Sequence, residues 1–171
     1  KQCVDHFGGV DILVNNVGIQ PLNSYKNVED TPEEMWDAII NVNLKSYFLM
    51  SKYSIPHMKN NGGGSIVNIA SVQGLQSMKL VPPYAASKGG VLSLTRQMSL
   101  DYASENIKVT AICPGTFNTP MVTNSIGKDV DLDQALKGFG EAHPVGRIGE
   151  PEEIGYAVSF LSSKKASFIT G

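Results

Sequence analysis

Short apolar runs bounded by turn residues recur along the chain and predict the strands of a sheet. Residues 10–16 (VDILVNN) lie between glycines, residues 65–71 (SIVNIAS) follow the turn sequence NNGGG, and residues 107–115 (IKVTAICPG) end in Pro-Gly. Because these runs are apolar rather than alternating, they indicate strands of the parallel type, buried on both faces. Residues 167–170 (SFIT) are compatible with the start of a fourth strand.

Longer segments with apolar residues at helical spacing separate these runs. The stretch Thr31-Pro32-Glu33-Glu34 has the sequence of a capping box with proline at the first helical position, and it predicts a helix that extends to about residue 59. A second helix is expected from Tyr84 to about residue 103, and a third opens at the EPEE sequence that starts at Glu150. Residues 116–148 predict a mobile loop with one or two short helices.

Strands that alternate with helices predict βαβ units, a parallel sheet and right-handed crossovers. In such sheets ligands bind at the carboxyl ends of the strands. Three short motifs fall at these ends: residues 15–18 after the first strand, Ser71 after the second, and Pro114-Gly115 after the third. The sequence therefore predicts an α/β domain with one ligand site at this edge of a parallel sheet.

Composition and charge narrow the classes of function. With 171 residues, 42% of them hydrophobic, the chain can form one domain with a core, and a net charge of −2 without a basic cluster argues against nucleic-acid and anionic-membrane partners. No apolar run is long enough to span a membrane and no signal peptide is present, which predicts a soluble cytoplasmic protein. Cys3 and Cys113 are expected to be reduced thiols, and His6, His57 and His143 lack metal-ligand spacing, so no catalytic metal is expected.

The sequence YAASK places Tyr84 and Lys88 four positions apart, thirteen residues after Ser71. On a helix the two side chains share one face. A free tyrosine has a pKa of about 10, and a nearby cation lowers it, so the phenol could exchange a proton with a substrate oxygen. Ser71 could hold the same oxygen. The alternative is an amphipathic surface helix that carries a tyrosine and a lysine by chance.

With these motifs in order, the chain resembles the short-chain dehydrogenases/reductases. They are single-domain Rossmann enzymes with a doubly wound parallel sheet, and they move a hydride between NAD(P) and a carbonyl or an alcohol. The resemblance covers nearly the whole chain. Its motifs, in family order, are NNVG at 15–18, with valine in place of alanine, NVNL at 41–44, NIAS ending at residue 71, YAASK at 84–88, PGTFNT at 114–119, RIGEPEEIG at 147–155 and ITG at 169–171.

The resemblance implies roles for individual residues. Tyr84 would be the general acid/base, Lys88 would hold the nicotinamide ribose and lower the pKa of Tyr84, and Ser71 would position the substrate oxygen. Asn43, through its backbone in a distorted helix, would hold a water beyond Lys88. The loop after residue 119 would close over the substrate. The implied cofactor contacts are Asn16, Val17, Gly18, Tyr84, Lys88, Pro114, Gly115, Phe117 and Thr119.

The implied function is NAD(P)-dependent interconversion of a secondary alcohol and a ketone in a small-molecule substrate. Two alternatives stay open: a related epimerase or dehydratase that uses the same tyrosine and lysine, and a non-catalytic relative that serves as a binding subunit. The cofactor is expected to be NAD or NADP, with a lean towards NAD. The expected substrate wall comprises Gln73, Met78, Val81 and Met121.

The resemblance also implies that residues 1–171 are the carboxyl-terminal two-thirds of a Rossmann domain, truncated at both ends. The first βαβ unit, which carries the family's glycine-rich pyrophosphate turn, is not among them. This span alone is therefore expected to bind dinucleotide poorly. The segments near 33–59 and 84–103 resemble the family's subunit-pairing helices, and the first has more apolar residues than one stripe needs, which predicts a homodimer or homotetramer.

Overall fold

Three parallel strands form the centre of the structure, a computed structural model that describes residues 2–127 and 129–171. They are β1 (Ile12–Asn15), β2 (Gly64–Ile69) and β3 (Ile107–Ile112). Each strand pairs with its neighbour in the sequence, in the order β1-β2-β3. The register places Leu13 beside Ile66, and Ile66 beside Val109. All three strands therefore end at the same edge of the sheet, as predicted.

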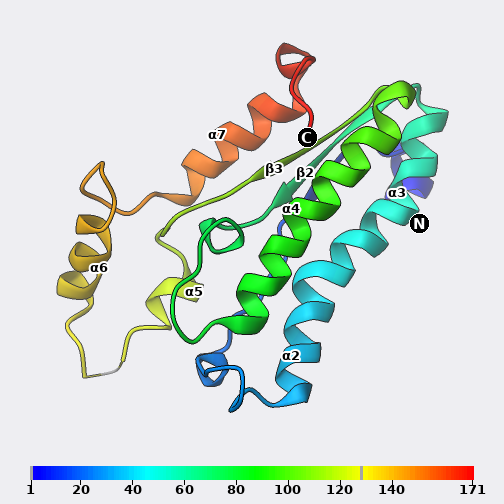
Figure 1. The fold of residues 1–171 in the computed structure, drawn as a ribbon. Helices are drawn as coiled ribbons and strands as arrows, with labels where there is room; N and C mark the ends of the chain where they lie inside the picture. Colours follow the sequence, from blue (N-terminus) through cyan, green and yellow to red (C-terminus); the bar gives the residue numbers. More distant parts are fainter. Residues whose placement is uncertain (1, 128) are drawn as a thin grey trace.

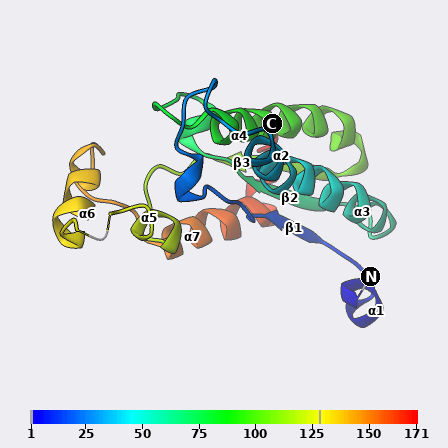
Figure 2. The same ribbon diagram turned by 90° about the horizontal axis from the view of Figure 1, so that it is seen from below.

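Helices precede, connect and follow these strands. They are α1 (Gln2–Phe7), α2 (Glu33–Ile40), α3 (Ser46–Asn60), α4 (Pro82–Tyr102), α5 (Pro120–Thr123), α6 (Leu132–Glu141) and α7 (Pro151–Ser162). Figures 1 and 2 show α2, α3 and α4 on one face and α7 on the other. The fold is α/β with a parallel sheet, as the alternation of strands and helices predicts. In the part of the chain that the structure describes, every helix is too short or too polar to cross a bilayer.

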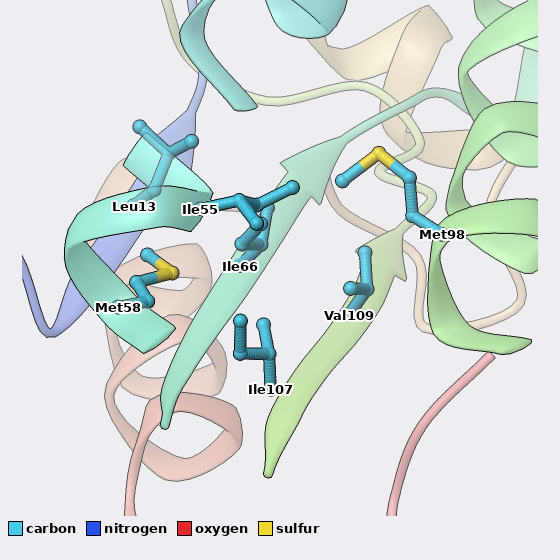
Figure 3. Close-up of a cluster of buried hydrophobic side chains, with 7 residues drawn as sticks. All are labelled: Leu13, Ile55, Met58, Ile66, Met98, Ile107 and Val109. Carbon is cyan, nitrogen blue, oxygen red and sulfur yellow. The ribbon is translucent and has the colours of Figure 1, made fainter. Parts of the chain in front are cut away.

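A buried apolar cluster joins the sheet to the crossover helices (Figure 3). Ile66 and Val109 of the sheet pack against Met58 of α3 and Met98 of α4. Met58, Ile66 and Val109 have no exposed surface. Burying one such side chain contributes about 1.5–3 kcal/mol. The cluster holds α3 and α4 against one face of the sheet and so positions the amino-terminal turn of α4 near the strand ends.

The first strand differs from the prediction of a strand buried on both faces. Leu13 and Asn15 are buried, but Ile12 is 51% exposed and Val14 is 40% exposed. β1 lies at the margin of the sheet, and α1 projects beyond its end rather than covering it (Figure 2). The prediction is wrong for this face because an apolar run indicates a strand but does not show what packs on it.

The predicted helix over residues 33–59 is interrupted near its middle. α2 ends at Ile40, residues Asn41–Lys45 form a turn of π-helix, and α3 follows. The expectation that Asn43 lies in a distorted helix is therefore met. The predicted capping box does not form: Pro32 precedes the helix without a side-chain cap, and the hydroxyl of Thr31 donates to the carbonyl of Asn27.

The segment after β3 contains the two short helices α5 and α6, as predicted for residues 116–148. Figure 1 shows α6 apart from the sheet. The EPEE sequence opens α7 as expected, since the Glu153 carboxylate accepts the backbone N–H of Glu150 at 2.8 Å. At the other end of α7, the ammonium of Lys108 donates to the carbonyls of Leu161 and Ser163 and so ties the helix to β3.

The fourth strand suggested by residues 167–170 does not form. Residues 167–171 have no strand conformation, although two of them reach β3. The backbone N–H of Gly171 donates to the carbonyl of Val109 at 2.9 Å, and the hydroxyl of Thr170 accepts the N–H of Val109. These contacts involve a single residue of β3, so they do not make the run of backbone hydrogen bonds that defines a strand pair.

Candidate active site

A cavity of about 880 Å³ opens at the carboxyl edge of the sheet. Its walls come from the strand ends, the start of α4, the segment after β3 and one side of α7. Of the residues predicted for the site, Asn43 and Val81 lie outside these walls. The cavity brings together the others: Asn16, Val17, Gly18, Ser71, Gln73, Met78, Tyr84, Lys88, Pro114, Gly115, Phe117, Thr119 and Met121.

The first turns of α4 carry Tyr84 and Lys88 on one face, as their spacing predicts. Pro82 and Pro83 begin this helix, where a missing N–H leaves no helical hydrogen bond unmade. The helix therefore starts two residues earlier than the sequence indicates. Val81, which precedes the prolines, is 2% exposed and is buried away from the cavity. Its assignment to the substrate wall is a wrong prediction, because an apolar residue beside the site in sequence turns into the core.

The ammonium of Lys88 is buried among aromatic rings and one carbonyl. Its Nζ donates to the carbonyl of Ile69 at 2.7 Å and lies 3.5 Å from the hydroxyl of Tyr47. It also lies 5.3 Å from the ring centre of Tyr47 and 5.8 Å from that of Tyr84. Burial disfavours the charged form and lowers the pKa of Lys88 to about 8. At neutral pH the side chain is still mostly protonated and can donate hydrogen bonds.

The phenol of Tyr84 does not have the lowered pKa that its spacing from Lys88 predicts. Burial is the largest influence and raises the pKa of Tyr84 above 10. The Ser71 side chain lowers this pKa by hydrogen bonding, and the nearby phenol of Tyr25 raises it. Removal of the phenolate from water therefore costs more than the hydrogen bond with Ser71 returns.

Ser71 lies two residues after the end of β2, with an extended backbone, and it caps the short turn that follows. Its Oγ accepts the backbone N–H of Gln73 at 3.1 Å, which starts a short 3-10 turn. This turn packs closely on α4, because a Cβ added at Gly74 would lie 2.7 Å from the carbonyl oxygen of Lys88. The glycine therefore allows Ser71 to be held against the helix that carries Tyr84 and Lys88.

Asn43 supports the site from behind the cavity wall. Its Oδ1 accepts the backbone N–H of Ile19 at 2.8 Å, and its Nδ2 donates to the carbonyl of Ile19 at 3.0 Å. Nδ2 also lies 3.3 Å from the hydroxyl of Ser87 on α4. Asn43 is fully buried, so these bonds occur in a low-dielectric setting. The side chain thus ties the loop after β1 to α4.

A line of buried polar side chains crosses the sheet below the cavity. The amide of Asn15 donates to Asn68 Oδ1 at 2.8 Å, and the amide of Asn68 donates to the hydroxyl of Thr95 at 2.9 Å. All three side chains are at most 5% exposed. Asn15 therefore bonds to side chains on neighbouring elements, whereas the adjacent Asn16 is exposed and lines the cavity.

The segment after β3 forms the opposite wall of the cavity and is held by a second segment. The backbone N–H of Gly149 donates to the carbonyl of Thr116 at 2.9 Å, and the N–H of Asn118 donates to the carbonyl of Gly149 at 2.8 Å. Phe117 packs so closely on Gly149 that a Cβ there would lie 2.3 Å from its ring. The GRIGEP region therefore helps to position Thr116 and Phe117 at the cavity.

Relatives of known family match this chain over its whole length. A family model described as Enoyl-(Acyl carrier protein) reductase matches residues 1–171. An uncharacterized oxidoreductase of Thermotoga maritima is 40% identical over 171 residues, which are 100% of this chain and 67% of that protein. The dehydrogenase/reductase SDR family member 4 of Bos taurus is 37% identical over 164 residues, which are 96% of this chain and 57% of that protein. The chain belongs to the short-chain dehydrogenase/reductase family.

This family consists of NAD(P)-dependent oxidoreductases that act on CH–OH groups, and its fold is present here. The ligand-free aldohexose dehydrogenase of Thermoplasma acidophilum superposes with a TM-score of 0.93 at 38% identity, covering 99% of this chain and 67% of that one. The resemblance found in the motifs is thereby confirmed, together with the Rossmann-like fold. The chain spans between 57% and 67% of the length of these three relatives.

The candidate site also contains residues that the motifs do not indicate. Tyr25 lines the cavity, Tyr47 lies against Lys88, and His143 bonds to the wall at Thr116. Tyr47 follows Asn43 by one helical turn, and that spacing could have indicated a shared face. Tyr25 lies in a loop, where no periodicity indicates which residues face the site. His143 is considered in the sequence only as a metal ligand, so its contact with Thr116 is not predicted.

Charge is sparse in this cavity. Lys88 is the charged side chain among its described lining residues. Within residues 2–127 and 129–171, no three His, Cys, Asp or Glu side chains gather in a way that could hold a metal ion. The polar groups available to a short-chain dehydrogenase/reductase ligand here are therefore hydroxyls, side-chain amides, backbone groups and one ammonium.

Proposed function

We propose that the full-length protein interconverts a secondary alcohol and a ketone, with NAD or NADP as the hydride carrier. The observation that carries this proposal is the convergence of Ser71, Tyr84 and Lys88 on one cavity at the carboxyl edge of the sheet. A hydroxyl and a phenol can both reach one substrate oxygen there, and a phenol can give or take the proton that accompanies hydride transfer. The relatives support oxidoreduction in general.

Tyr84 is the general acid/base in this proposal. Burial raises its pKa, so at neutral pH it is a phenol, the form that donates a proton to a ketone oxygen during reduction. Ser71 holds the same oxygen, since its side chain lies within hydrogen-bonding reach of Tyr84. Lys88 holds ribose hydroxyls with the ammonium that already binds the carbonyl of Ile69. Asn43 acts through the π-helical turn, whose backbone we expect to hold a water on the far side of Lys88.

The residues present fit the nicotinamide half of a dinucleotide. A Cβ added at Gly18 would lie 3.6 Å from both Lys88 Nζ and Asn43 Oδ1, so the backbone after β1 passes close to the ammonium. The same cavity is lined by Pro114, Gly115, Phe117 and Thr119. Val17, where the family has alanine, is 67% exposed, which leaves room for its extra methyl groups. When bound, the nicotinamide gives or takes the hydride. We propose NAD as the cofactor. Residues 1–171 form part of one dinucleotide-binding domain in this proposal.

The substrate wall follows from the cavity lining. Gln73, Met78 and Met121 line the cavity and are assigned to this wall, and Tyr25 adds a phenol near Tyr84. Val81 is left out of this wall because it is buried. A small alcohol or ketone with apolar surface and one or two further polar groups suits these side chains.

Substitution of Tyr84 in the full-length protein tests the proposed function. Tyr84→Phe removes the hydroxyl and should lower kcat with a turned-over alcohol or ketone by about 10² to 10⁴-fold, the usual share of general acid–base catalysis. Tyr156→Phe, on an exposed tyrosine of α7, is the matched control and should keep its kcat. A Tyr84→Phe protein with unchanged kcat would remove Tyr84 from the chemistry, and absence of turnover with a broad alcohol panel would remove the function itself.

We further propose that the full-length protein pairs with copies of itself through the helices near 33–59 and 84–103. Exposed apolar side chains on these helices support this: Phe48, Met50, Tyr53 and Leu100 are each at least 47% exposed. Such side chains on two neighbouring helices are characteristic of interaction surfaces. Light scattering at micromolar concentration should give the mass of a dimer or tetramer, and a monomer mass would refute this arrangement.

A further inference from the structure

His143 lies behind the cavity wall and contacts two segments that line it. The residue follows Ala142, the C-cap of α6, and its Nδ1 lies 2.8 Å from the carbonyl oxygen of Phe139, one turn earlier. Its Nε2 lies 3.0 Å from the backbone nitrogen of Thr116, in the segment after β3. Both Phe139 and Thr116 line the cavity, whereas the imidazole does not. The ring therefore forms a bridge between two walls that are far apart in the sequence.

The partners determine the tautomer of this ring. A carbonyl oxygen can only accept a hydrogen bond, so Nδ1 must carry the proton that it donates to Phe139. A backbone N–H can only donate, so Nε2 must be unprotonated to accept from Thr116. The neutral Nδ1–H form satisfies both contacts at once, and each ring nitrogen is used. A histidine on the surface can bond to water at both nitrogens, whereas His143 has one partner that can only accept and one that can only donate.

The bridge also gives a physical reason for the glycine at position 115. A Cβ added to Gly115 would lie 2.6 Å from Nε2 of His143, well inside contact distance. The imidazole thus occupies the space that any side chain at this position would take. Sequence motifs assign Gly115 to the cofactor side of the cavity, but in the structure its missing side chain also admits His143 to the backbone of Thr116.

We propose that His143 is a positioning residue that sets the distance between the nicotinamide wall, whose segment contains Thr116, and the part of α6 that lines the cavity at Phe139. This rests on the proposed function, which places the nicotinamide beside the segment that runs from Pro114 to Thr119. Figures 1 and 2 show α6 at one side of the molecule, away from the sheet. The hydrogen bond between the His143 side chain, at the end of α6, and the backbone of Thr116, after β3, is therefore well placed to fix the position of α6 at the cavity.

Two substitutions separate the contacts of the bridge. In His143→Gln, the amide oxygen lies as many bonds from Cα as Nε2 does, so it can still accept from Thr116. In His143→Asn, the amide nitrogen matches Nδ1, so it can donate to Phe139 but cannot reach Thr116. His143→Leu keeps neither contact. The glutamine and asparagine variants have the same functional group and differ only in reach, which makes each the control for the other.

The test is steady-state kinetics of the full-length protein together with amide hydrogen exchange at Thr116. We expect His143→Gln to stay within about twofold of the parent. His143→Asn and His143→Leu should lose about 3- to 10-fold in kcat/KM, the range for one lost hydrogen bond. The loss should fall on the KM values of both cofactor and substrate more than on kcat, because the reacting groups are untouched. Exchange at Thr116 should quicken by about 3- to 10-fold in the asparagine and leucine variants alone.

Equal behaviour of the glutamine and asparagine variants in both measurements would overturn the bridge. So would losses in kcat/KM that follow only the fraction of folded protein, since a merely structural role predicts that pattern. If the parent protein turns over no alcohol or ketone, the proposed function fails. The exchange rates at Thr116 then still decide whether the bridge exists, because they do not depend on activity.

Discussion

Replacement of Lys88 by methionine should stabilise the fold while it removes the proposed activity. The pKa of Lys88 falls from 10.5 to about 8 because its ammonium is buried. At about 1.4 kcal/mol for each pH unit, this difference means that the charged side chain costs the folded state roughly 3 kcal/mol. Methionine has a similar length and no charge. The carbonyl of Ile69 keeps a partner in this variant, since the hydroxyl of Tyr47 also donates to it at 3.1 Å.

The sign of the pH dependence follows from the same values. Below pH 8 both the folded and the unfolded protein carry a charged Lys88, and the full cost of burial is present. Between pH 8 and 10.5 the unfolded state binds the extra proton, so the parent gains stability as the pH rises. The advantage of Lys88→Met is therefore largest at neutral pH and fades through this window. We expect about 1–3 kcal/mol at pH 7, after the loss of the contact to Ile69.

Urea unfolding of the cofactor-free, full-length protein at pH 7 and at pH 9.5 measures this difference. Lys137→Met, on the exposed surface of α6, is the control and should change the free energy of unfolding by less than about 0.5 kcal/mol. A Lys88→Met protein that is less stable than the parent at pH 7 would refute the reasoning. A difference that is the same at both pH values would do so as well, because it could not come from the titration of Lys88.

Further predictions concern the support of the site. Gly74→Ala should lower the free energy of unfolding by about 1–3 kcal/mol, because its Cβ would lie 2.7 Å from a backbone oxygen of α4. Gly89→Ala is its counterpart on the facing helix, where the nearest atom is 3.7 Å away, and it should raise that free energy by about 0.5–1 kcal/mol in the same urea titration; destabilisation by both would show that the contact distances do not govern the outcome. Asn43→Ala should cost about 1–3 kcal/mol and speed hydrogen exchange at the Ile19 amide, and an unchanged exchange rate there would mean that the side chain does not hold this loop.

The sequence could predict the core of the candidate site because the relevant distances are local. Tyr84 and Lys88 share a helix face by spacing alone, and Ser71 and Gly18 follow strands whose ends must meet in a parallel sheet. The helix distortion at Asn43 came from the family resemblance and not from periodicity, since the apolar pattern of residues 33–59 runs on without a visible break. The motifs that lie at strand ends were thus the dependable part of the prediction.

The remaining features depend on tertiary contacts and on the burial that they produce, and a single sequence does not specify these contacts. Val14 is apolar like its neighbours, but it lies on the marginal strand β1, where its side chain lines the cavity and is 40% exposed. The pKa of Tyr84 rises because burial outweighs the hydrogen bond with Ser71, and burial is a property of the assembled cavity. His143 has a place in the site only because its partner at Thr116 lies on another segment.

The buried line from Asn15 through Asn68 to Thr95 bears on how the chain avoids wrong pairings of its strands. Asn15 and Asn68 are partners in the register of β1 and β2, so their amides meet only when the strands are aligned as observed. A slip by one residue that sets Val14 opposite Asn68 would turn the Asn15 amide to the opposite face and leave Asn68 Oδ1 buried without this donor, at a cost of about 1–3 kcal/mol. Apolar side chains such as Val67 and Ile69 would tolerate that slip far better. Asn15 and Asn68 therefore disfavour an alignment that the apolar residues alone would accept, and the observed alignment is the one that brings the strand ends level at the cavity.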